Sequence, residues 1–385
     1  MNKFIGIIIP AIVGVFNILI ILFPTDMIAA ARDGLWLWFN TVVPSLLPFI
    51  ILTNILSAGG ALAFISRAME PVMRPLFGVP GVGGFAFTAG IVSGYPVGAK
   101  IIAQLRADGS VTRVEAQRLL AFCNNSGPLF MLGAVGVSMF GSAKTGYFIL
   151  ATHYISAVIT GLLFKYYGGS KDKNRICESD AVSRMRKQPS ERTLGAILGG
   201  SVKNAIETIL LVGGFIILFS VIVKILEITQ IIGVIGSLLG GILGINTQTA
   251  NGLLTGLIEV TNGARVISAD SFSRQQIAVV CGIIAFGGFC IHAQALSFIA
   301  HTDIKASIYI LAKTVQAIIA ATTASLLFPL VVFTREAYVP AFLTMESSFW
   351  EKLAFSVTGV AAIGVLVMGF AGTAAWFGIR GRRLK

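Results

Sequence analysis

The stretch Gly90-Ile-Val-Ser-Gly-Tyr-Pro-Val-Gly-Ala-Lys100 places two inner glycines and a proline in the middle of an apolar region. Proline lacks a backbone amide and clashes with the preceding turn, so an unbroken helix is not expected here. In a membrane, such a break persists only where protein or a water-filled cavity satisfies the freed backbone groups. A helix that restarts after Pro96 would direct its partly positive amino end at the break. The stretch therefore predicts either a broken helix beside a cavity or a tight hairpin packed on glycine.

The same pattern recurs in the second half of the chain. Gly90-Ile-Val-Ser93 is matched 166 residues later by Gly256-Leu-Ile-Glu259, and Gly98-Ala-Lys100 is matched 165 residues later by Gly263-Ala-Arg265. Further matches in the same order pair Phe49-Ile-Ile-Leu52 with Phe215-Ile-Ile-Leu218, Ala121-Phe122 with Ala285-Phe286, and Leu162-Leu-Phe164 with Leu326-Leu-Phe328. One short apolar match arises easily by chance, but several in order at nearly one offset indicate an internal duplication.

The composition of the whole chain suits lipid. Its 385 residues are 55% hydrophobic and 12% charged, whereas a soluble domain carries about 25% charged residues. Several apolar runs reach the ~20 residues that a helix needs to cross a bilayer; they are 4–23, 145–167, 205–225, 277–299 and 307–333. These runs lack the two-residue alternation of a barrel, and an open sheet would leave unpaired edges in lipid. The expected fold class is an all-α integral membrane protein.

Neither the first apolar run nor the cysteines change this class. Residues 4–23 exceed the apolar core of about 7–15 residues in a signal peptide, and no A-x-A-like site closes them well, so we expect a retained helix. The cysteines show no metal-binding spacing and indicate neither a disulfide framework nor a redox site; they are Cys123, Cys177, Cys281 and Cys290. No metal or other cofactor is expected.

The net charge of +12 is concentrated in one polar loop and the carboxyl-terminal tail. The basic residues concerned are Lys171, Lys173, Arg175, Arg184, Arg186, Lys187 and Arg192 in the loop, and Arg380, Arg382, Arg383 and Lys385 in the tail. Cytoplasmic loops of membrane proteins are enriched in lysine and arginine. These charges therefore indicate orientation and contact with anionic lipid rather than nucleic acid, and both termini are predicted to be cytoplasmic.

With this orientation, we expect about eight transmembrane helices plus two re-entrant or broken-helix regions. The predicted spans are 4–23, 35–57, 119–141, 145–167, 205–227, 277–300, 307–333 and 351–377, and the re-entrant regions are 71–105 and 229–276. The expected parts are an N-terminal helix and outer loop (1–34), a first repeat (35–167), a basic loop and linker (168–204), a second repeat (205–333) and a C-terminal helix with a basic tail (334–385). The halves then run in opposite directions, as in the inverted repeats of many secondary transporters.

No catalytic constellation is found. The chain lacks the nucleotide-binding Gly-x-x-x-x-Gly-Lys-Ser/Thr pattern, the His-Glu-x-x-His zinc pattern and a nucleophile elbow. An ATP-driven pump or an intramembrane protease is therefore not expected, and the chain is not predicted to be an enzyme. An inverted repeat without catalytic motifs favours a transporter of a small polar solute.

The candidate binding residues lie beside the breaks. In the first half, Cys123-Asn-Asn-Ser-Gly-Pro128 combines strongly polar side chains with a second helix break; such groups face a cavity or join neighbouring helices through hydrogen bonds. In the second half, Glu259 and Arg265 either serve a ligand or pair with each other, and His292 is either functional or structural. The full set is Ser93, Gly94, Tyr95, Pro96, Lys100, Asn124, Asn125, Ser126, Glu259, Asn262, Arg265 and His292. Lys224 and Lys313 are set aside, because a lysine near a span can extend to the interface.

Three runs carry a family resemblance: Pro44-Ser-Leu-Leu-Pro-Phe49, Ser93-Gly-Tyr-Pro-Val-Gly-Ala-Lys100 and Phe122-Cys-Asn-Asn-Ser-Gly-Pro-Leu-Phe130. Together they resemble the YlbJ (SpoVV) sporulation integral membrane proteins, which belong with the nucleoside-recognition, or Gate, domain proteins. The resemblance covers nearly the whole chain. It implies a role in endospore formation, in which dipicolinic acid moves from the mother cell across the outer forespore membrane.

The residues are compatible with that cargo. Dipicolinate is a planar dianion, and Lys100 and Arg265, with the helix amino ends at the breaks, would suit its two carboxylates. Their matched positions predict that a pseudo-twofold brings both cations to one central site. Two alternatives remain open: a nucleoside cargo read by Asn124, Asn125 and Glu259, and a membrane scaffold or sensor without transport. The sequence also leaves open a homo-oligomer and the coupling ion.

Overall fold

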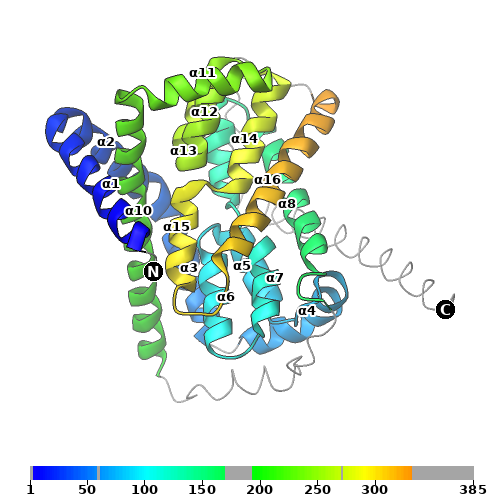
Figure 1. The fold of residues 1–385 in the computed structure, drawn as a ribbon. Coiled ribbons are helices and arrows are strands. Elements are labelled where there is room, and N and C mark those ends of the chain that lie inside the picture. Colours follow the sequence, from blue (N-terminus) through cyan, green and yellow to red (C-terminus); the bar gives the residue numbers. More distant parts are fainter. Residues whose placement is uncertain (1–2, 59–60, 170–192, 270–271, 332–385) are drawn as a thin grey trace, which may run out of the picture.

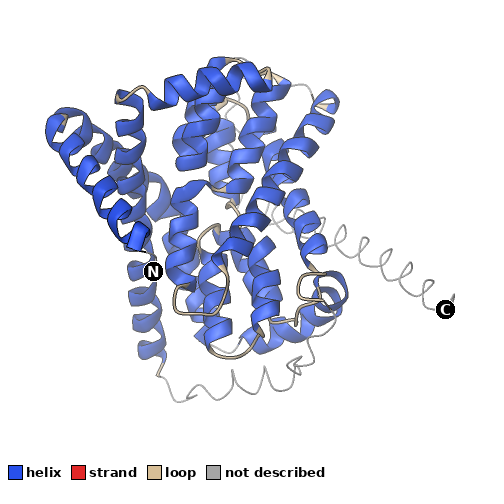
Figure 2. Ribbon diagram, in the orientation of Figure 1, coloured by secondary structure: helices blue, strands red, loops and turns tan. Residues whose placement is uncertain are grey.

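The computed structural model describes residues 3–58, 61–169, 193–269 and 272–331. Every regular element within these ranges is helical (Figure 2), which confirms the predicted all-α class. The predicted span at 351–377, the basic tail and most of the basic loop lie outside the described residues.

The described residues of the first half form ten helical elements. They are α1 (Lys3–Leu22), α2 (Pro24–Leu37), the π-helical segment η1 (Trp38–Val42), α3 (Val43–Ala58), α4 (Ala61–Phe77), α5 (Gly83–Ser93), α6 (Val97–Ala107), α7 (Arg113–Cys123), the π-helical segment η2 (Phe130–Met139) and α8 (Ala143–Phe164). The second half comprises α10 (Leu194–Ile228), α11 (Ile231–Leu243), α12 (Thr247–Ile258), α13 (Val260–Ser268), α14 (Arg274–Phe286), α15 (Gly288–Ile299), α16 (Ala306–Leu327) and the 3-10 turn η3 (Phe328–Leu330).

The order of elements from α3 to α8 recurs from α10 to α16. Each series has an apolar helix, a peripheral helix (α4 or α11), a helical hairpin (α5–α6 or α12–α13), a helix broken in the middle (α7–η2 or α14–α15) and a closing helix. In Figure 1, α4 and the α5–α6 hairpin lie toward the bottom, whereas α11 and the α12–α13 hairpin lie toward the top. The sequence matches fall on equivalent elements, since Gly90 lies in α5 and Gly256 in α12.

The described residues contain four helices that are long and apolar enough to cross a membrane, or up to six if each of two bent pairs is one span. The four are Ala143–Phe164, Leu194–Ile228, Arg274–Ile299 and Ala306–Leu330; the bent pairs are Pro10–Leu22 with Pro24–Val42 and Ile231–Leu243 with Thr247–Ile258. Two expected spans are not single α-helices, because 35–57 passes through the π-helical segment η1 and 119–141 is interrupted between α7 and η2. The number of eight spans stays a prediction.

The N-terminal region also differs from the prediction. Residues 25–34, expected as an outer loop, belong to α2. Pro24 occupies the first turn and Asp26 follows it, and both residues favour a helix start. Met27 and Ala30 are buried on the face that packs against α10, so this segment gains tertiary contacts that a loop would lack.

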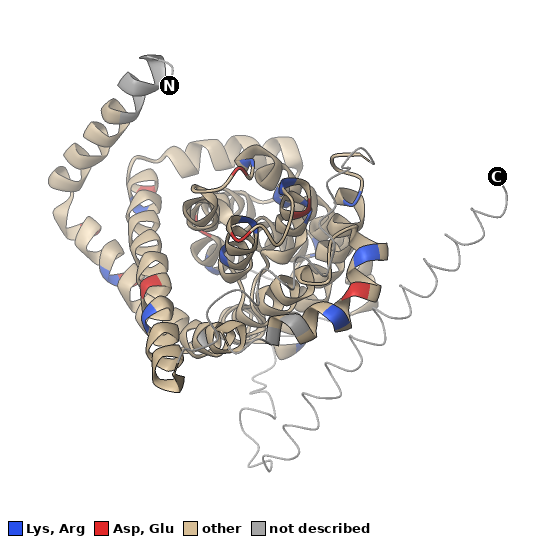
Figure 3. Ribbon diagram, turned by 90° about the horizontal axis from the view of Figure 1, so that it is seen from below, with Lys and Arg blue, Asp and Glu red and all other residues tan. Residues whose placement is uncertain are grey.

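The two halves interlock around the hairpins. The largest buried cluster surrounds α5, α6 and α7, and a second surrounds α13 and α14. Elements of opposite halves also pack together, because α15 contacts α6 and α13 contacts η2. Seen from below, the helices carry long stretches without any charged residue (Figure 3). The outer face of α10 exposes Leu210 and Leu218, as expected of a lipid-facing helix.

Candidate functional site

The first break forms the tip of the α5–α6 hairpin. Helix α5 ends at Ser93, Gly94 adopts a positive φ of 81°, and α6 begins directly after Pro96. A Cβ atom added to Gly90 or Gly98 would strike the carbonyl oxygen of Cys123. The hairpin is therefore packed on glycine against the end of α7, which brings its polar tip beside the second break.

The second break separates α7 from η2 and is held by hydrogen bonds from α16 and α8. The Asn124 side chain donates to the Tyr309 hydroxyl (2.8 Å), and the Lys313 Nζ donates to the Asn124 carbonyl oxygen (2.9 Å). The backbone amide of Ser126 donates to Nε2 of His153 (3.1 Å). Asn124, Asn125 and Ser126 are all fully buried. The interhelical hydrogen bonding left open by the sequence thus accounts for Asn124.

The side chain of Asn125 is also hydrogen-bonded within the protein. Its amide nitrogen donates to the Phe122 carbonyl, and its amide oxygen accepts from the Gln316 side chain at 3.1 Å. The polar groups of residues 124 and 125 are therefore largely engaged within the protein, whereas the Ser126 hydroxyl has no hydrogen-bond partner in the structure.

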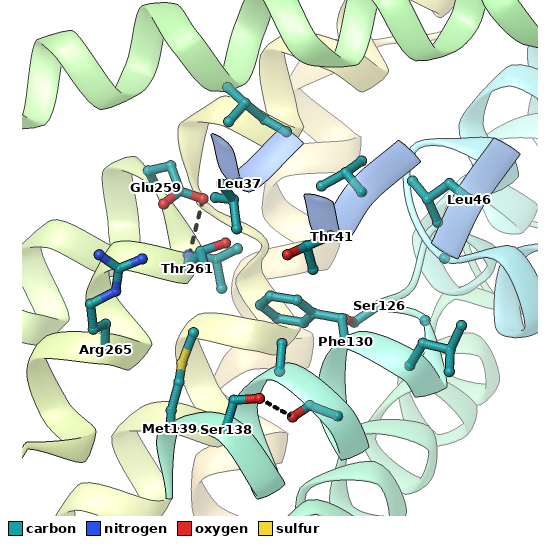
Figure 4. A pocket seen from close by; sticks show the side chains of 18 of the residues that line it. Leu37, Thr41, Leu46, Ser126, Phe130, Ser138, Met139, Glu259, Thr261 and Arg265 are labelled. Atoms are coloured by element: carbon teal, nitrogen blue, oxygen red, sulfur yellow. Dashed lines mark hydrogen bonds between the residues drawn. The ribbon is translucent and has the colours of Figure 1, made fainter. Parts of the chain in front are cut away.

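The third break lies at Glu259, a single extended residue between α12 and α13. Its carboxylate accepts hydrogen bonds from the backbone amides of Thr261 (3.0 Å) and Asn262 (2.8 Å). These are two of the first amides of α13, which have no partner inside the helix. Glu259 is thus an N-cap, and it forms no ion pair with Arg265 (Figure 4).

The fourth break lies at Gly287 and Gly288, which have positive φ angles of 90° and 71°. Helix α15 follows and carries Gln294, whose side-chain oxygen has no hydrogen-bond partner. It also carries His292, whose ring packs edge-on against Phe286 at a centroid distance of 4.5 Å and against Tyr309 at 5.2 Å. Neither ring nitrogen of His292 has a hydrogen-bond partner in the structure.

A cavity of about 1330 Å³ lies where these breaks meet. Its walls come from η1, the tips of both hairpins, η2 and α15, with Thr41, Phe130 and Met139 among the lining residues (Figure 4). The predicted site residues that line it are Ser93, Gly94, Tyr95, Ser126, Glu259 and Arg265. The predicted residues outside its lining are Pro96, Lys100, Asn124, Asn125, Asn262 and His292.

The structure does not bring Lys100 and Arg265 to one site. The Lys100 ammonium donates to the side chains of Asn204 and of Thr208 (2.7 Å) on α10, so it anchors the first hairpin to that helix. Arg265 lines the cavity, and no ion pair of its guanidinium occurs within the described ranges. Lys100 and Arg265 lie on the equivalent helices α6 and α13, as their matched positions predict, but only the Arg265 side chain lines the cavity.

Lys313 corrects another expectation. It was expected to extend to the interface, but its side chain is 1% exposed. Its Nζ donates to Gln316 Oε1 (2.6 Å) as well as to the Asn124 carbonyl. Tyr309, Lys313 and Gln316 are spaced four and three residues apart, which places them on one helix face. That polar stripe within an apolar helix was the signal in the sequence.

These observations define a helical membrane protein in which two series of broken helices surround a cavity with polar groups at the breaks, the arrangement typical of membrane transporters. A family model described as Gate, nucleoside recognition, matches residues 39–143. The chain is 36% identical over 340 residues to the sporulation integral membrane protein YlbJ of Bacillus subtilis (strain 168), covering 84% of this chain and 83% of that protein. It therefore belongs to the YlbJ family of sporulation integral membrane proteins.

Solved structures of CNTnw are also similar. The inward-facing, substrate-bound state matches 84% of this chain and 86% of its own with 14% identity and a TM-score of 0.48. A variant in an outward-facing state matches 86% of this chain and 87% of its own with 12% identity and a TM-score of 0.48.

Proposed function

We propose that this protein is a permease for a small dianion, dipicolinate, which it moves from the mother cell across the outer forespore membrane during sporulation. The observation that carries the proposal is Arg265, a cation that lines the cavity and forms no ion pair within the described residues. A guanidinium binds a carboxylate through two parallel hydrogen bonds. Membership of a sporulation membrane protein family supports this cargo.

The opposite wall suits a second carboxylate. Ser93, Tyr95 and Ser126 line the cavity, where the hydroxyl groups of Tyr95 and Ser126 lie close to each other and are buried together with that of Ser93. A hydroxyl donates readily to a carboxylate oxygen. A planar ligand with a carboxylate at each end would join this wall to Arg265.

The carboxylate of Glu259 does not oppose this arrangement. Its two hydrogen bonds from the first amides of α13 place its charge against the partly positive end of that helix. The other acidic residue of the lining is Asp33, which lies on α2. Arg265 is therefore left as the residue that recognises an anion.

The test is uptake of labelled dipicolinate into proteoliposomes that contain the purified protein. Wild-type protein should show saturable uptake. Arg265→Gln should reduce it at least tenfold, equivalent to about 1.4 kcal/mol, because the variant loses the cavity cation. Arg67→Gln is the matched control, since Arg67 is an exposed arginine on α4 outside the cavity lining. An unchanged rate in Arg265→Gln at equal protein content would refute the assignment.

A nucleoside cargo is the second candidate, favoured by the Gate match over residues 39–143. That range includes the hairpin tip and the Asn124–Ser126 break. A nucleoside is neutral, so its uptake should survive Arg265→Gln, whereas loss of the Ser126 hydroxyl should reduce it. Saturable nucleoside uptake without dipicolinate uptake would support this candidate. Absence of both, with an intact fold, would support a scaffold or sensor.

A further inference from the structure

Lys313 is a buried lysine that the proposed anion site does not use. Its Nζ donates hydrogen bonds to two neutral acceptors, the Asn124 carbonyl oxygen at 2.9 Å and Gln316 Oε1 at 2.6 Å. No ion pair of Lys313 occurs among the described residues. A charge buried without a counter-charge is costly, and an ionisable residue inside a membrane helix is rare and usually functional.

Several buried titratable side chains lie on the helices that pack against α16, the helix of Lys313. Helices α7, α8 and α14 pack against α16, and their buried titratable side chains are Glu115, Arg118 and Cys123 on α7, His153 on α8 and Cys281 on α14. Glu115 and Arg118 are engaged at the other end of α7, in its capping box and with the Tyr167 and Gly78 carbonyls. His292 on α15 and His153 both lie within electrostatic range of Lys313.

The same groups connect Lys313 to the cavity. Lys313 binds the carbonyl of Asn124, and the Ser126 hydroxyl two residues later lines the cavity. Tyr309, on the same helix as Lys313, contacts both the Asn124 side chain and the His292 ring. His292 in turn lies two residues before Gln294, which lines the cavity. A change of charge at Lys313 would thus act on the break that forms the cavity wall.

We propose that Lys313 carries a proton that is transported together with the anion, an inference that rests on the proposed function. In the empty protein Lys313 is a neutral amine, which can donate both hydrogen bonds of its Nζ; when the anion enters the cavity, the amine takes up one proton from water and becomes an ammonium. When the anion leaves, the ammonium returns that proton to water on the other side. An anion in the cavity stabilises the ammonium, so the two bind together and each strengthens binding of the other by the same factor.

The chemistry of the side chain separates this role from a purely structural one. Lysine can lose its proton in a buried site, whereas arginine stays charged in proteins. Lys313→Arg therefore keeps a cation but removes the exchangeable proton, and Lys313→Gln removes both. Lys305→Gln is the matched control, because the Lys305 side chain is exposed and its contact with Gln117 uses only backbone atoms.

The experiment measures proton uptake on addition of dipicolinate to purified protein in weakly buffered solution, with a pH-sensitive dye. Wild-type protein and Lys305→Gln should take up about one proton per bound anion. Lys313→Arg and Lys313→Gln should take up none. In proteoliposomes, a pH gradient should accelerate dipicolinate uptake by the wild type, whereas the Lys313 variants should lose this acceleration and retain exchange of internal for external dipicolinate.

The outcomes distinguish this inference from the proposed function. Dipicolinate uptake by the wild type without proton uptake, or a Lys313 variant that still responds to the gradient, would overturn the role of Lys313 alone. A wild type that transports no dipicolinate would overturn the proposed function. Retained exchange in at least one Lys313 variant shows that its fold is intact, and loss of exchange in both would assign Lys313 to the structure of the break.

Discussion

At the residue scale, close approach of backbones decides where the cavity lies. Gly98 of α6 packs directly on the end of α7, and a Cβ atom there would strike the Cys123 carbonyl oxygen. Backbone atoms cannot move aside as a flexible side chain does, so the hairpin itself would have to shift. The polar tip of the hairpin, with Ser93 and Tyr95, would shift with it.

We expect Gly98→Ala to destabilise the protein by about 1–3 kcal/mol, the usual cost of overpacking, and to reduce transport. Thermal unfolding in detergent, followed by intrinsic fluorescence, measures the first effect. Gly214→Ala is the matched control, since a Cβ atom at Gly214 of α10 meets nothing within 4 Å. Equal unfolding temperatures for the two variants would contradict the close packing.

The sequence located the breaks but not every side chain at them. Glycine and proline mark a break because of backbone geometry, which is local, and Gly94 and Pro96 lie at the first break as expected. Which way a side chain points depends on the helices packed around it. Lys100 therefore bonds to α10 instead of entering the cavity, and Lys313 is buried instead of extending to the interface.

At the element scale, two contacts join the region around the α6–α7 loop to the loop between α15 and α16. Arg106 of α6 forms an ion pair with Asp303 at 2.8 Å, and this guanidinium lowers the pKa of the Asp303 carboxyl. Gln117 of α7 bonds through its side chain to both the amide (2.9 Å) and the carbonyl (3.0 Å) of Lys305. The first contact is largely exposed and the second is buried.

We expect Gln117→Leu to cost more stability than Asp303→Asn. The glutamine change leaves two backbone groups of Lys305 without partners, at about 1–3 kcal/mol, whereas an exposed ion pair contributes about 0–1 kcal/mol. A lowered pKa means that the contribution of Asp303 is present above its unfolded pKa and is lost as pH falls through its folded pKa. The unfolding temperatures of Asp303→Asn and wild type should therefore differ at neutral pH and converge as the pH becomes acidic. A larger loss of stability in Asp303→Asn than in Gln117→Leu at neutral pH would contradict this ranking.

At the scale of the whole molecule, the order of elements follows the sequence matches more closely than the span count does. The offset matches follow sequence order, and they fall on equivalent elements of the two series. Counting spans from apolar runs overlooks breaks: α14–α15 is long enough to cross a membrane despite its break, whereas the hairpins and α7–η2 are built of short helices. The contact between Arg106 and Asp303 places the α6–α7 and α15–α16 loops at one end, in agreement with the predicted topology.

The inverted arrangement itself is tested by labelling single cysteines in a Cys177→Ser background with a membrane-impermeant maleimide. The cysteines at 123, 281 and 290 are buried and should stay unlabelled in the folded protein. Asp108→Cys and His301→Cys, which are exposed in the α6–α7 and α15–α16 loops, should react only from the cytoplasmic face. Lys144→Cys and Gln230→Cys, exposed at the starts of α8 and α11, should react only from the opposite face. Asp108 follows the first hairpin and Gln230 precedes the second. If both were labelled from one face, the two halves would run in the same direction. The shared cavity would then need another explanation than an inverted repeat.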